Sequence, residues 1–347
     1  MSTPLLEVRE LRTHFLTARG AVKAVDGVSF TLERGRTLGV VGESGSGKTV
    51  LSRSIMGMLP RKNVIRGGDF LYNGTALSTL SSRELRDLRG AEISMVFQDP
   101  MTSLNPVVRI GRQITETMEQ HLDVSKVEAR RKAVDLLESV GIPDPDRRLR
   151  EYPHQLSGGL RQRVIIAIAL SCGPKLLLAD EPTTALDVTV QAQILDLLGR
   201  QQQERFMAMI LVTHDLGVVA GRTDEIAVMY AGRIVERAPT PVLFSDMKHR
   251  YTQALFRSIP QIHEPAHKRL VAIDGRPPDL AATGKGCAFA PRCRFARDRC
   301  SNDTPPLRQV ADGHFHACWY PVEKGEAEVE PPRRIADTRG LSAPSQP

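Results

Sequence analysis

The chain has 347 residues, of which 41% are hydrophobic and 25% charged, and its formal net charge is +7. This composition is typical of a globular protein that buries a hydrophobic core, and the length allows one large domain with an appendage or two modest domains. The longest purely apolar runs, such as residues 164–170, have seven residues. Because a membrane helix needs roughly 20 apolar residues, we expect no segment of this chain to cross a bilayer.

The first residues of the chain also bear on where it works. Residues 1–15 lack the charged-then-apolar layout of a secretory signal, so we expect a cytoplasmic protein. A reducing compartment disfavours structural disulfides. The positive net charge suits a nucleic acid or an anionic membrane surface, and equally a spread of solvated arginine and lysine side chains.

The first 240 residues alternate short apolar runs with amphipathic stretches, which predicts an α/β fold. In chain order, the pattern indicates a buried strand at 37–42, a helix at 47–59 and a short β element at 67–77 that turns at Asn73-Gly74. Residues 105–169 are mostly helical in pattern. Buried strands return at 175–181 and 207–215, and a hairpin that turns at Ala231-Gly232 is expected over 225–238.

Beyond about residue 260 the composition shifts to proline, arginine and cysteine. We therefore predict an α/β nucleotide-binding domain over residues 1–262 and a small cysteine-rich C-terminal module over 263–322. Residues 323–347, rich in glutamate, proline and arginine, predict a disordered tail.

Residues 42–49, "GESGSGKT", fit the phosphate-loop pattern G-x-x-x-x-G-K-[ST] between a predicted strand and a predicted helix. Glycine in such a loop lets backbone N–H groups turn inward toward phosphate oxygens, aided by the helix N-terminus. Lys48 would reach the β- and γ-phosphates of ATP, and the Thr49 hydroxyl would bind Mg²⁺. The expected ATP-binding set in this loop is Gly42, Glu43, Ser44, Gly45, Ser46, Gly47, Lys48 and Thr49.

An acidic pair, Asp180 and Glu181, follows the apolar run in "LLLADE" (176–181). The run predicts a buried strand that delivers Asp180 to its carboxyl end, where the carboxylate would hold Mg²⁺ through water. Glu181 lies one residue further on and would act as general base toward an attacking water. An apolar run that ends in Asp-Glu is weak evidence by itself, because many strands end in this way. Together with the phosphate loop, it predicts a nucleotide-hydrolysis site.

Four further segments stand in a fixed order with these two, and together they resemble ATP-binding cassette (ABC) proteins over about residues 5 to 240. The resemblance implies a RecA-like P-loop NTPase fold with a helical subdomain at about 100–170. The segments are "VFQDPMTSLNP" (96–106), "LSGGLRQRVIIAIAL" (156–170), "TTALDVTVQAQIL" (183–195) and "LVTHD" (211–215).

The resemblance also implies a role for particular residues. Gln98 would contact Mg²⁺ and the attacking water, and His214 would contact the γ-phosphate beside Glu181. Phe15 is placed to stack on adenine, with a buried core phenylalanine as the alternative. Two cassettes would stack head to tail, so that one segment closes over the ATP of the partner. The residues expected to act in that way are Leu156, Ser157, Gly158, Gly159 and, across the dimer interface, Asp187.

The resemblance is closest to the ATP-binding subunits of dipeptide and oligopeptide importers, and it covers about residues 5 to 320, including "HRYTQALFRSIP" (249–260). It implies ATP hydrolysis at the cytoplasmic face of the inner membrane, with a second cassette forming a heterodimer, two permease subunits and, indirectly, an extracytoplasmic solute-binding protein. Nickel, glutathione or another small solute is the alternative cargo. A soluble nucleic-acid-associated ATPase is an alternative supported only by the net charge.

Four cysteines, Cys287, Cys293, Cys300 and Cys318, leave spacings of five, six and seventeen residues. Four thiolates suit a [4Fe–4S] cluster or zinc, and the wide gaps with five basic residues between 285 and 300 favour the cluster. Free thiols or oxidised pairs are the remaining alternatives. Cys172 is expected to be an inert buried thiol.

Overall fold

The computed structural model describes residues 3–60, 62–99, 103–184, 186–258, 273–281 and 284–323. A sheet of eight strands forms its centre, in the order β11-β12-β10-β9-β3-β8-β7-β6. The strands are β3 (Thr37–Val41), β6 (Ile93–Val96), β7 (Leu176–Asp180), β8 (Ala208–Thr213), β9 (Glu225–Tyr230), β10 (Arg233–Pro239), β11 (Arg308–Ala311) and β12 (His314–His316). The α/β fold expected from the sequence is thus present.

Five neighbouring strands of this sheet, from β9 through β3, β8 and β7 to β6, run parallel. Every residue of β3, β7 and β8 is buried. A parallel strand covered on both faces has no solvent side, which explains why these segments are continuous apolar runs. Because parallel strands point the same way, their carboxyl ends meet at one edge of the sheet.

A second sheet has four antiparallel strands in the order β2-β1-β4-β5. They are β1 (Leu6–Thr17), β2 (Gly20–Leu32), β4 (Val64–Tyr72) and β5 (Thr75–Ala76). The turn between β4 and β5 has φ of 50° at Asn73 and 80° at Gly74, as expected for this dipeptide in a two-residue hairpin. Alternate residues of β1 and β2 are buried in a hydrophobic core that this sheet shares with one face of the central sheet.

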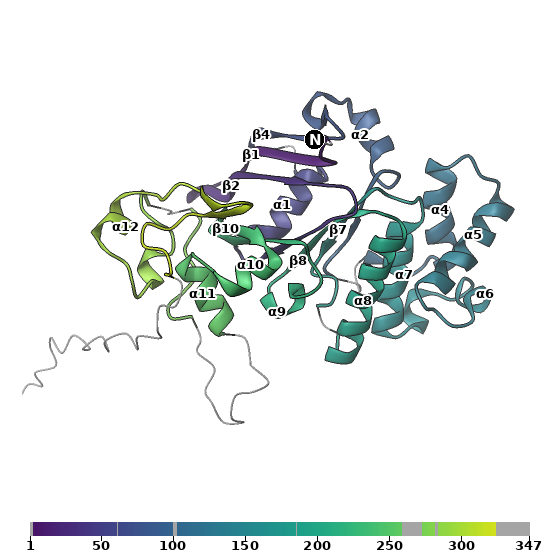
Figure 1. Ribbon diagram of the computed structural model, residues 1–347. Coiled ribbons are helices and arrows are strands. Elements are labelled where there is room, and N and C mark those ends of the chain that lie inside the picture. The colour runs from purple at the N-terminus through teal and green to yellow at the C-terminus, as the bar shows by residue number, and fades with distance from the viewer. Residues whose placement is uncertain are drawn as a thin grey trace, which may run out of the picture.

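Helices pack against the central sheet, and a group of them lies beyond one end of it. Figure 1 shows α4, α5 and α6 at the end of the molecule opposite to α12, with α1 between the two sheets. The helices are α1 (Lys48–Ile55), α2 (Ser82–Leu88), α4 (Ile110–His121), α5 (Lys126–Ser139), α6 (Pro145–Arg148), α7 (Gly158–Leu170), α8 (Val188–Glu204), α9 (Leu216–Val219), α10 (Thr240–Ser245), α11 (Arg250–Arg257) and α12 (Asp298–Asn302).

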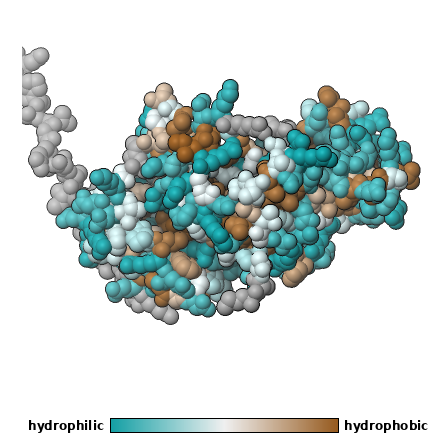
Figure 2. Space-filling model, turned by 90° about the horizontal axis from the view of Figure 1, so that it is seen from above, coloured by the Kyte–Doolittle hydropathy of each residue, from teal (hydrophilic) through white to brown (hydrophobic). Residues whose placement is uncertain are grey.

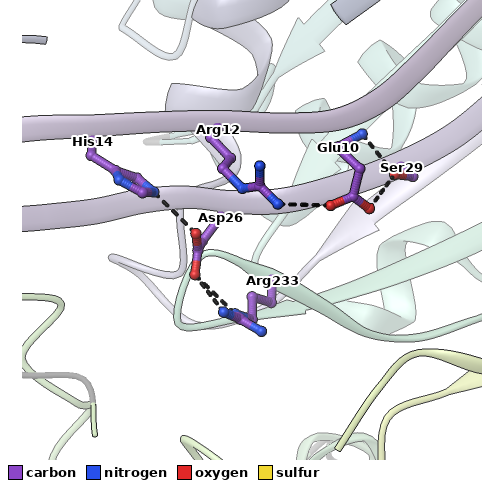
Figure 3. A network of polar contacts seen from close by, with 6 residues as sticks. All are labelled: Glu10, Arg12, His14, Asp26, Ser29 and Arg233. Carbon is purple, nitrogen blue, oxygen red and sulfur yellow. Dashed lines mark hydrogen bonds and ion pairs between the residues drawn. The ribbon is translucent and has the colours of Figure 1, made fainter. Parts of the chain in front are cut away.

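A polar network fastens the small sheet to the central one (Figure 3). Asp26 of β2 accepts hydrogen bonds from Arg233 at the start of β10, at 2.6 and 3.1 Å, and lies 3.1 Å from the His14 ring of β1. Burial is the largest single influence and acts to raise the pKa of Asp26. The hydrogen bonds and charge of Arg233, the hydrogen bond with His14 and the charge of Lys23 together outweigh it, so the pKa is lowered. The carboxylate therefore stays ionised where the two sheets meet.

The C-terminal strands belong to the central sheet. Strand β12 pairs with β10, with Glu236 opposite His316. Glu236 is fully buried and accepts hydrogen bonds from the backbone N–H groups of Lys248 and His249, and its Oε1 lies 3.0 Å from the His314 ring. The predicted division after residue 262 stays a prediction, and the predicted disordered tail lies outside the described residues from 324 onward.

Within the residues that the structure describes, no helix is long and apolar enough to cross a membrane. Figure 2 shows hydrophobic residues scattered in small groups among hydrophilic ones over the face that it draws.

Candidate active site

The phosphate-loop residues 42–47 connect β3 to α1 in a backbone conformation that requires glycine. Gly42, Gly45 and Gly47 have φ of 154°, 80° and 106°, a region that L side chains rarely adopt. A Cβ on Gly47 would lie 2.0 Å from the carbonyl oxygen of Ala24 on β2, and a Cβ on Gly42 would lie 2.2 Å from the carbonyl oxygen of Met229 on β9. The loop backbone therefore packs too closely against β2 and β9 for a side chain at residues 42 and 47.

Lys48, the first residue of α1, is only 4% exposed. Its Nζ donates to the carbonyl oxygens of Gly42 at 2.7 Å and Glu43 at 3.0 Å. Burial lowers the pKa of Lys48, while Glu181, Asp180 and Glu43 act to raise it. The ammonium group is held inside its own loop, where phosphate oxygens would offer the same kind of acceptor.

Thr49 and Asp180 lie together, as the sequence predicts. The Thr49 hydroxyl donates to Asp180 Oδ1 at 3.1 Å, and Asp180 is 1% exposed at the end of β7. Burial raises the pKa of Asp180, and the hydrogen bond from Thr49 acts against that rise. A hydroxyl and a carboxylate are oxygen donors of the kind that Mg²⁺ accepts, so this pair fits the expected magnesium site.

Glu181 is the next residue, and it has a φ of 46°. Its Oε2 accepts hydrogen bonds from Gln98 Nε2 at 2.8 Å and from Thr184 Oγ1 at 3.0 Å, and lies 3.4 Å from His214 Nδ1. Gln98 follows β6 and His214 follows β8. Three parallel strands thus deliver these side chains to the same sheet edge, where a carboxylate oriented by an amide and an imidazole can accept a proton from water.

A pocket of about 370 Å³ lies over the phosphate loop and reaches Glu181. Phe15 of β1 lines it, as the adenine-stacking role requires. Sequence reasoning missed Leu280, which comes from the far C-terminal part of the chain and which no local pattern indicates. The described residues that line the pocket are Phe15, Val22, Ala24, Ser44, Gly45, Gly47, Lys48, Thr49, Val50, Gln98, Glu181 and Leu280.

Other predicted site residues lie outside this pocket. Ser157 is the N-cap of α7 and accepts from the Leu160 N–H, and Asp187 is the N-cap of α8 and accepts from the Val190 N–H. Ser157, Gly158 and Asp187 are exposed, whereas Leu156 is buried. A Cβ on Gly159 would lie 2.9 Å from Val190 of α8, which accounts for this glycine by packing.

The predicted iron–sulfur or zinc site is wrong. Among the described residues, no group of three or more histidine, cysteine, aspartate or glutamate side chains is placed to hold a metal ion. The four thiols instead line a cavity of about 20 Å³, room for about one water molecule. Burial raises the pKa of Cys287 and Cys293 to about 11, so these thiols favour the neutral form. All five cysteines are free.

Four of the five basic residues between 285 and 300, which the sequence suggests would offset a cluster's charge, have other partners. Arg292 pairs with Glu43 and Arg294 with Asp274. Arg297 lies over the Tyr320 ring and Arg299 over the Trp319 ring, at 4.2 and 3.5 Å from the ring centroids. Their charge is thus engaged by carboxylates and aromatic faces.

The α/β sheet and the contacts at its carboxyl edge define a P-loop protein that binds and hydrolyses a nucleoside triphosphate. The family model described as "ABC transporter" matches residues 25–184, and that described as "Oligopeptide/dipeptide transporter, C-terminal region" matches residues 235–300. The structure also resembles the ATP-binding cassette MJ0796, solved as a dimer bound to ADP and Pi, with a TM-score of 0.61 and 25% identity over 68% of this chain and 98% of that one.

Two relatives align over nearly the whole chain. The oligopeptide transport ATP-binding protein OppD of Bacillus subtilis (strain 168) is 48% identical over 96% of this chain and 93% of the relative. The dipeptide transport ATP-binding protein DppD of Escherichia coli (strain K12) is 47% identical over 92% of this chain and 97% of the relative. The chain belongs to the ABC transporter family, in its group of oligopeptide and dipeptide ATP-binding proteins. It is accordingly an ATPase.

Proposed function

We propose that this chain hydrolyses ATP at the described pocket to energise the uptake of dipeptides or oligopeptides through a membrane importer. The observation that carries the chemistry is the placement of Glu181, held by Gln98, Thr184 and His214 at the end of the phosphate-loop pocket. The peptide cargo is supported by relatives named as oligopeptide and dipeptide transport proteins, which are 47–48% identical over more than nine tenths of this chain.

The predicted site residues in and beside the pocket have the following proposed tasks. The loop N–H groups and Lys48 bind the phosphates, and Phe15 contacts adenine. Glu181 takes a proton from the attacking water, while His214 and Gln98 orient that water and the γ-phosphate. Thr49, Gln98 and Asp180 would hold Mg²⁺, which neutralises charge on the β- and γ-phosphates when it is bound. Positioning and charge neutralisation supply most of the rate.

The assembly is proposed to be a head-to-tail dimer of cassettes. Ser157 and Gly158 are exposed at the start of α7 and lie outside the chain's own pocket. The Ser157 oxygen accepts from the Leu160 N–H, and we propose that its O–H donor and the first N–H groups of the helix bind the ATP of a partner. Asp187 is exposed in the same way at the start of α8. The dimeric form of MJ0796 supports this arrangement, and a related second ATPase is the proposed partner.

The transporter context is proposed from the same relatives. Two permease subunits would receive the cassettes at the cytoplasmic face of the membrane, near the loop after Gln98, of which residues 100–102 lie outside the described part. A solute-binding protein outside the membrane would deliver the peptide. The cysteine-rich residues 263–322 are proposed to be a C-terminal module typical of this group, in agreement with the family model that matches residues 235–300.

The test is reconstitution of the chain with its second cassette and two permeases in vesicles that contain ATP, with the solute-binding protein added outside. Uptake of a labelled dipeptide or oligopeptide that stops in the Glu181→Gln variant supports the proposal. Uptake of nickel or glutathione without peptide uptake would replace the cargo and keep the ATPase. ATPase activity that responds to DNA or RNA and not to permeases would contradict the importer, with salt-dependent binding as its mark.

A further inference from the structure

The nucleotide pocket has an unexpected contributor from the C-terminal part of the chain. Leu280 lines the pocket together with Phe15, Val22 and the phosphate loop, although about 230 residues separate it from that loop along the sequence. Its carbonyl oxygen accepts a hydrogen bond from the Lys23 N–H of β2 at 3.2 Å. This bond fixes residue 280 beside the strand that forms one wall of the pocket.

The position of Leu280 within the pocket follows from the strand register. Phe15 of β1 is opposite Val22 of β2, and Lys23 is the next residue along β2. Leu280 therefore lies near the apolar part of the pocket wall that Phe15 and Val22 form, whereas Lys48 and Thr49 form the phosphate end. An apolar wall suits the base and ribose of a nucleotide, because phosphate groups need charged or N–H donors.

The segment that carries Leu280 is tied to the phosphate loop by one arginine. Arg292 donates to both carboxylate oxygens of Glu43, at 2.6 and 2.9 Å, and its side chain is only 5% exposed. The same guanidinium donates to the carbonyl oxygens of Asp274 at 2.9 Å and Ile273 at 3.4 Å. One buried side chain thus joins residues 273–281 to the second residue of the loop.

The ion pair between Arg292 and Glu43 is built into its surroundings. Arg292 also donates to the Tyr230 hydroxyl at 3.3 Å, and the Glu43 N–H donates to the Tyr251 hydroxyl at 2.8 Å. A bidentate arginine–carboxylate pair has a fixed geometry. A movement of the C-terminal segment would therefore shift Glu43 and, with it, the phosphate loop.

We propose that Leu280 is a nucleotide-binding residue that contacts the base and ribose of ATP, and that Arg292 is the positioning residue that holds the Leu280 segment against the phosphate loop. The inference rests on the proposed function, in which ATP occupies this pocket. It assigns to the C-terminal part of the chain a direct share in nucleotide affinity.

The experiment compares two ligands on the purified full-length chain by calorimetry: ATP, which has a base, and inorganic tripolyphosphate, which has none. Leu280→Ala should weaken ATP binding about three- to tenfold, the worth of part of a buried leucine contact, and leave tripolyphosphate binding unchanged. Leu280→Met should restore ATP affinity. Equal losses for both ligands, or no loss for ATP, would overturn the role of Leu280.

Arg292 is tested by its coupling to Leu280. If Arg292 positions the segment, Leu280→Ala should cost little once Arg292→Ala is present, so the two losses in ATP affinity should not add. Arg294→Ala is the matched control, because it removes a neighbouring pair to Asp274 that is exposed and does not reach the loop. Additive losses would contradict the positioning role.

The same experiment distinguishes failure of the proposed function from failure of the inference about Leu280. A wild-type chain that binds neither ATP nor tripolyphosphate would refute nucleotide binding at this pocket, whereas normal wild-type ATP binding with an unaffected Leu280→Ala variant refutes only the further inference.

Discussion

Glu181 is the proposed general base of ATP hydrolysis, and a substitution at this residue tests that role directly. Glu181→Gln keeps the shape of the side chain and its acceptor oxygen but removes the proton acceptor. ATP hydrolysis should therefore slow by about 10²–10⁴, the usual worth of a general base, while ATP binding is retained. Steady-state phosphate release and equilibrium ATP binding measure the two effects.

Two further variants serve as comparisons for Glu181→Gln. Thr184→Val removes a hydrogen bond to the same Oε2 oxygen of Glu181 and keeps the base, so its effect on the hydrolysis rate should be much smaller. Lys48→Ala should give the opposite pattern to Glu181→Gln, with nucleotide binding itself weakened, because its ammonium sits inside the loop. Near-normal hydrolysis by Glu181→Gln would remove Glu181 from the proposed role.

At the scale of single elements, helix α11 begins at a buried histidine. His249 caps this helix by accepting from the Tyr251 N–H at 3.0 Å, and it is 1% exposed. Burial lowers its pKa from 6.5 to about 4; Glu236 acts to raise the pKa and His316 to lower it further. The folded protein therefore holds this ring neutral in a range where the unfolded chain would protonate it.

The sign of the resulting pH dependence follows from proton counting. Between pH 4 and 6.5 the unfolded state binds more protons than the folded state at His249, so stability falls as the pH drops through this window. The contribution lost between pH 7 and pH 5 should be on the order of 1–2 kcal/mol. His249→Asn still caps a helix but does not titrate, so the shift of its urea midpoint between these pH values should be smaller. An identical shift in both proteins would contradict this account.

The elements that the sequence predicts well are those with a dense local pattern. The strands predicted at 37–42 and 175–181 are found at 37–41 and 176–180, and the hairpin predicted over 225–238 turns at Ala231-Gly232 as expected. The phosphate-loop pattern at 42–49 forms a loop over 42–47 followed by the first residues of α1. Each of these elements follows from residues adjacent in the sequence. At the site, the apolar run before Glu181 predicts that residue, whereas Gln98 and His214 are predicted only by the resemblance to ABC proteins. In the structure each of the three follows a parallel strand whose carboxyl end lies at the same sheet edge.

The remaining elements depend on long-range contacts that no local pattern records. Strands β1 and β2 pair in a register interrupted by bulges. Strand β12 pairs with β10, about 80 residues earlier in the chain, and β11 pairs with β12. The cysteine prediction was wrong for a related reason. Spacing alone does not reveal that Arg292 is engaged by Glu43 of the phosphate loop, or that the space among the thiols is small.

At the scale of the whole molecule, the ATP site of one chain is proposed to be completed by the α7 start of another. Ser157→Arg would place a long side chain where the partner's γ-phosphate binds. In the assembled transporter this change should slow ATP hydrolysis at least about tenfold, by loss of transition-state positioning. ATP affinity of the isolated chain should stay the same, because Ser157 does not line its own pocket.

The control for that prediction must separate the interface from helix capping. Ser157 caps α7, and replacing such a cap costs about 1 kcal/mol by itself. Ser125 caps α5 in the same manner, by accepting from the Glu128 N–H, and it is also exposed. Ser125→Arg therefore carries the same capping loss without reaching the proposed interface. Hydrolysis that falls to the same extent in both variants would mean that Ser157 acts only within its own helix, whereas a loss confined to Ser157→Arg places this residue against the ATP of the partner.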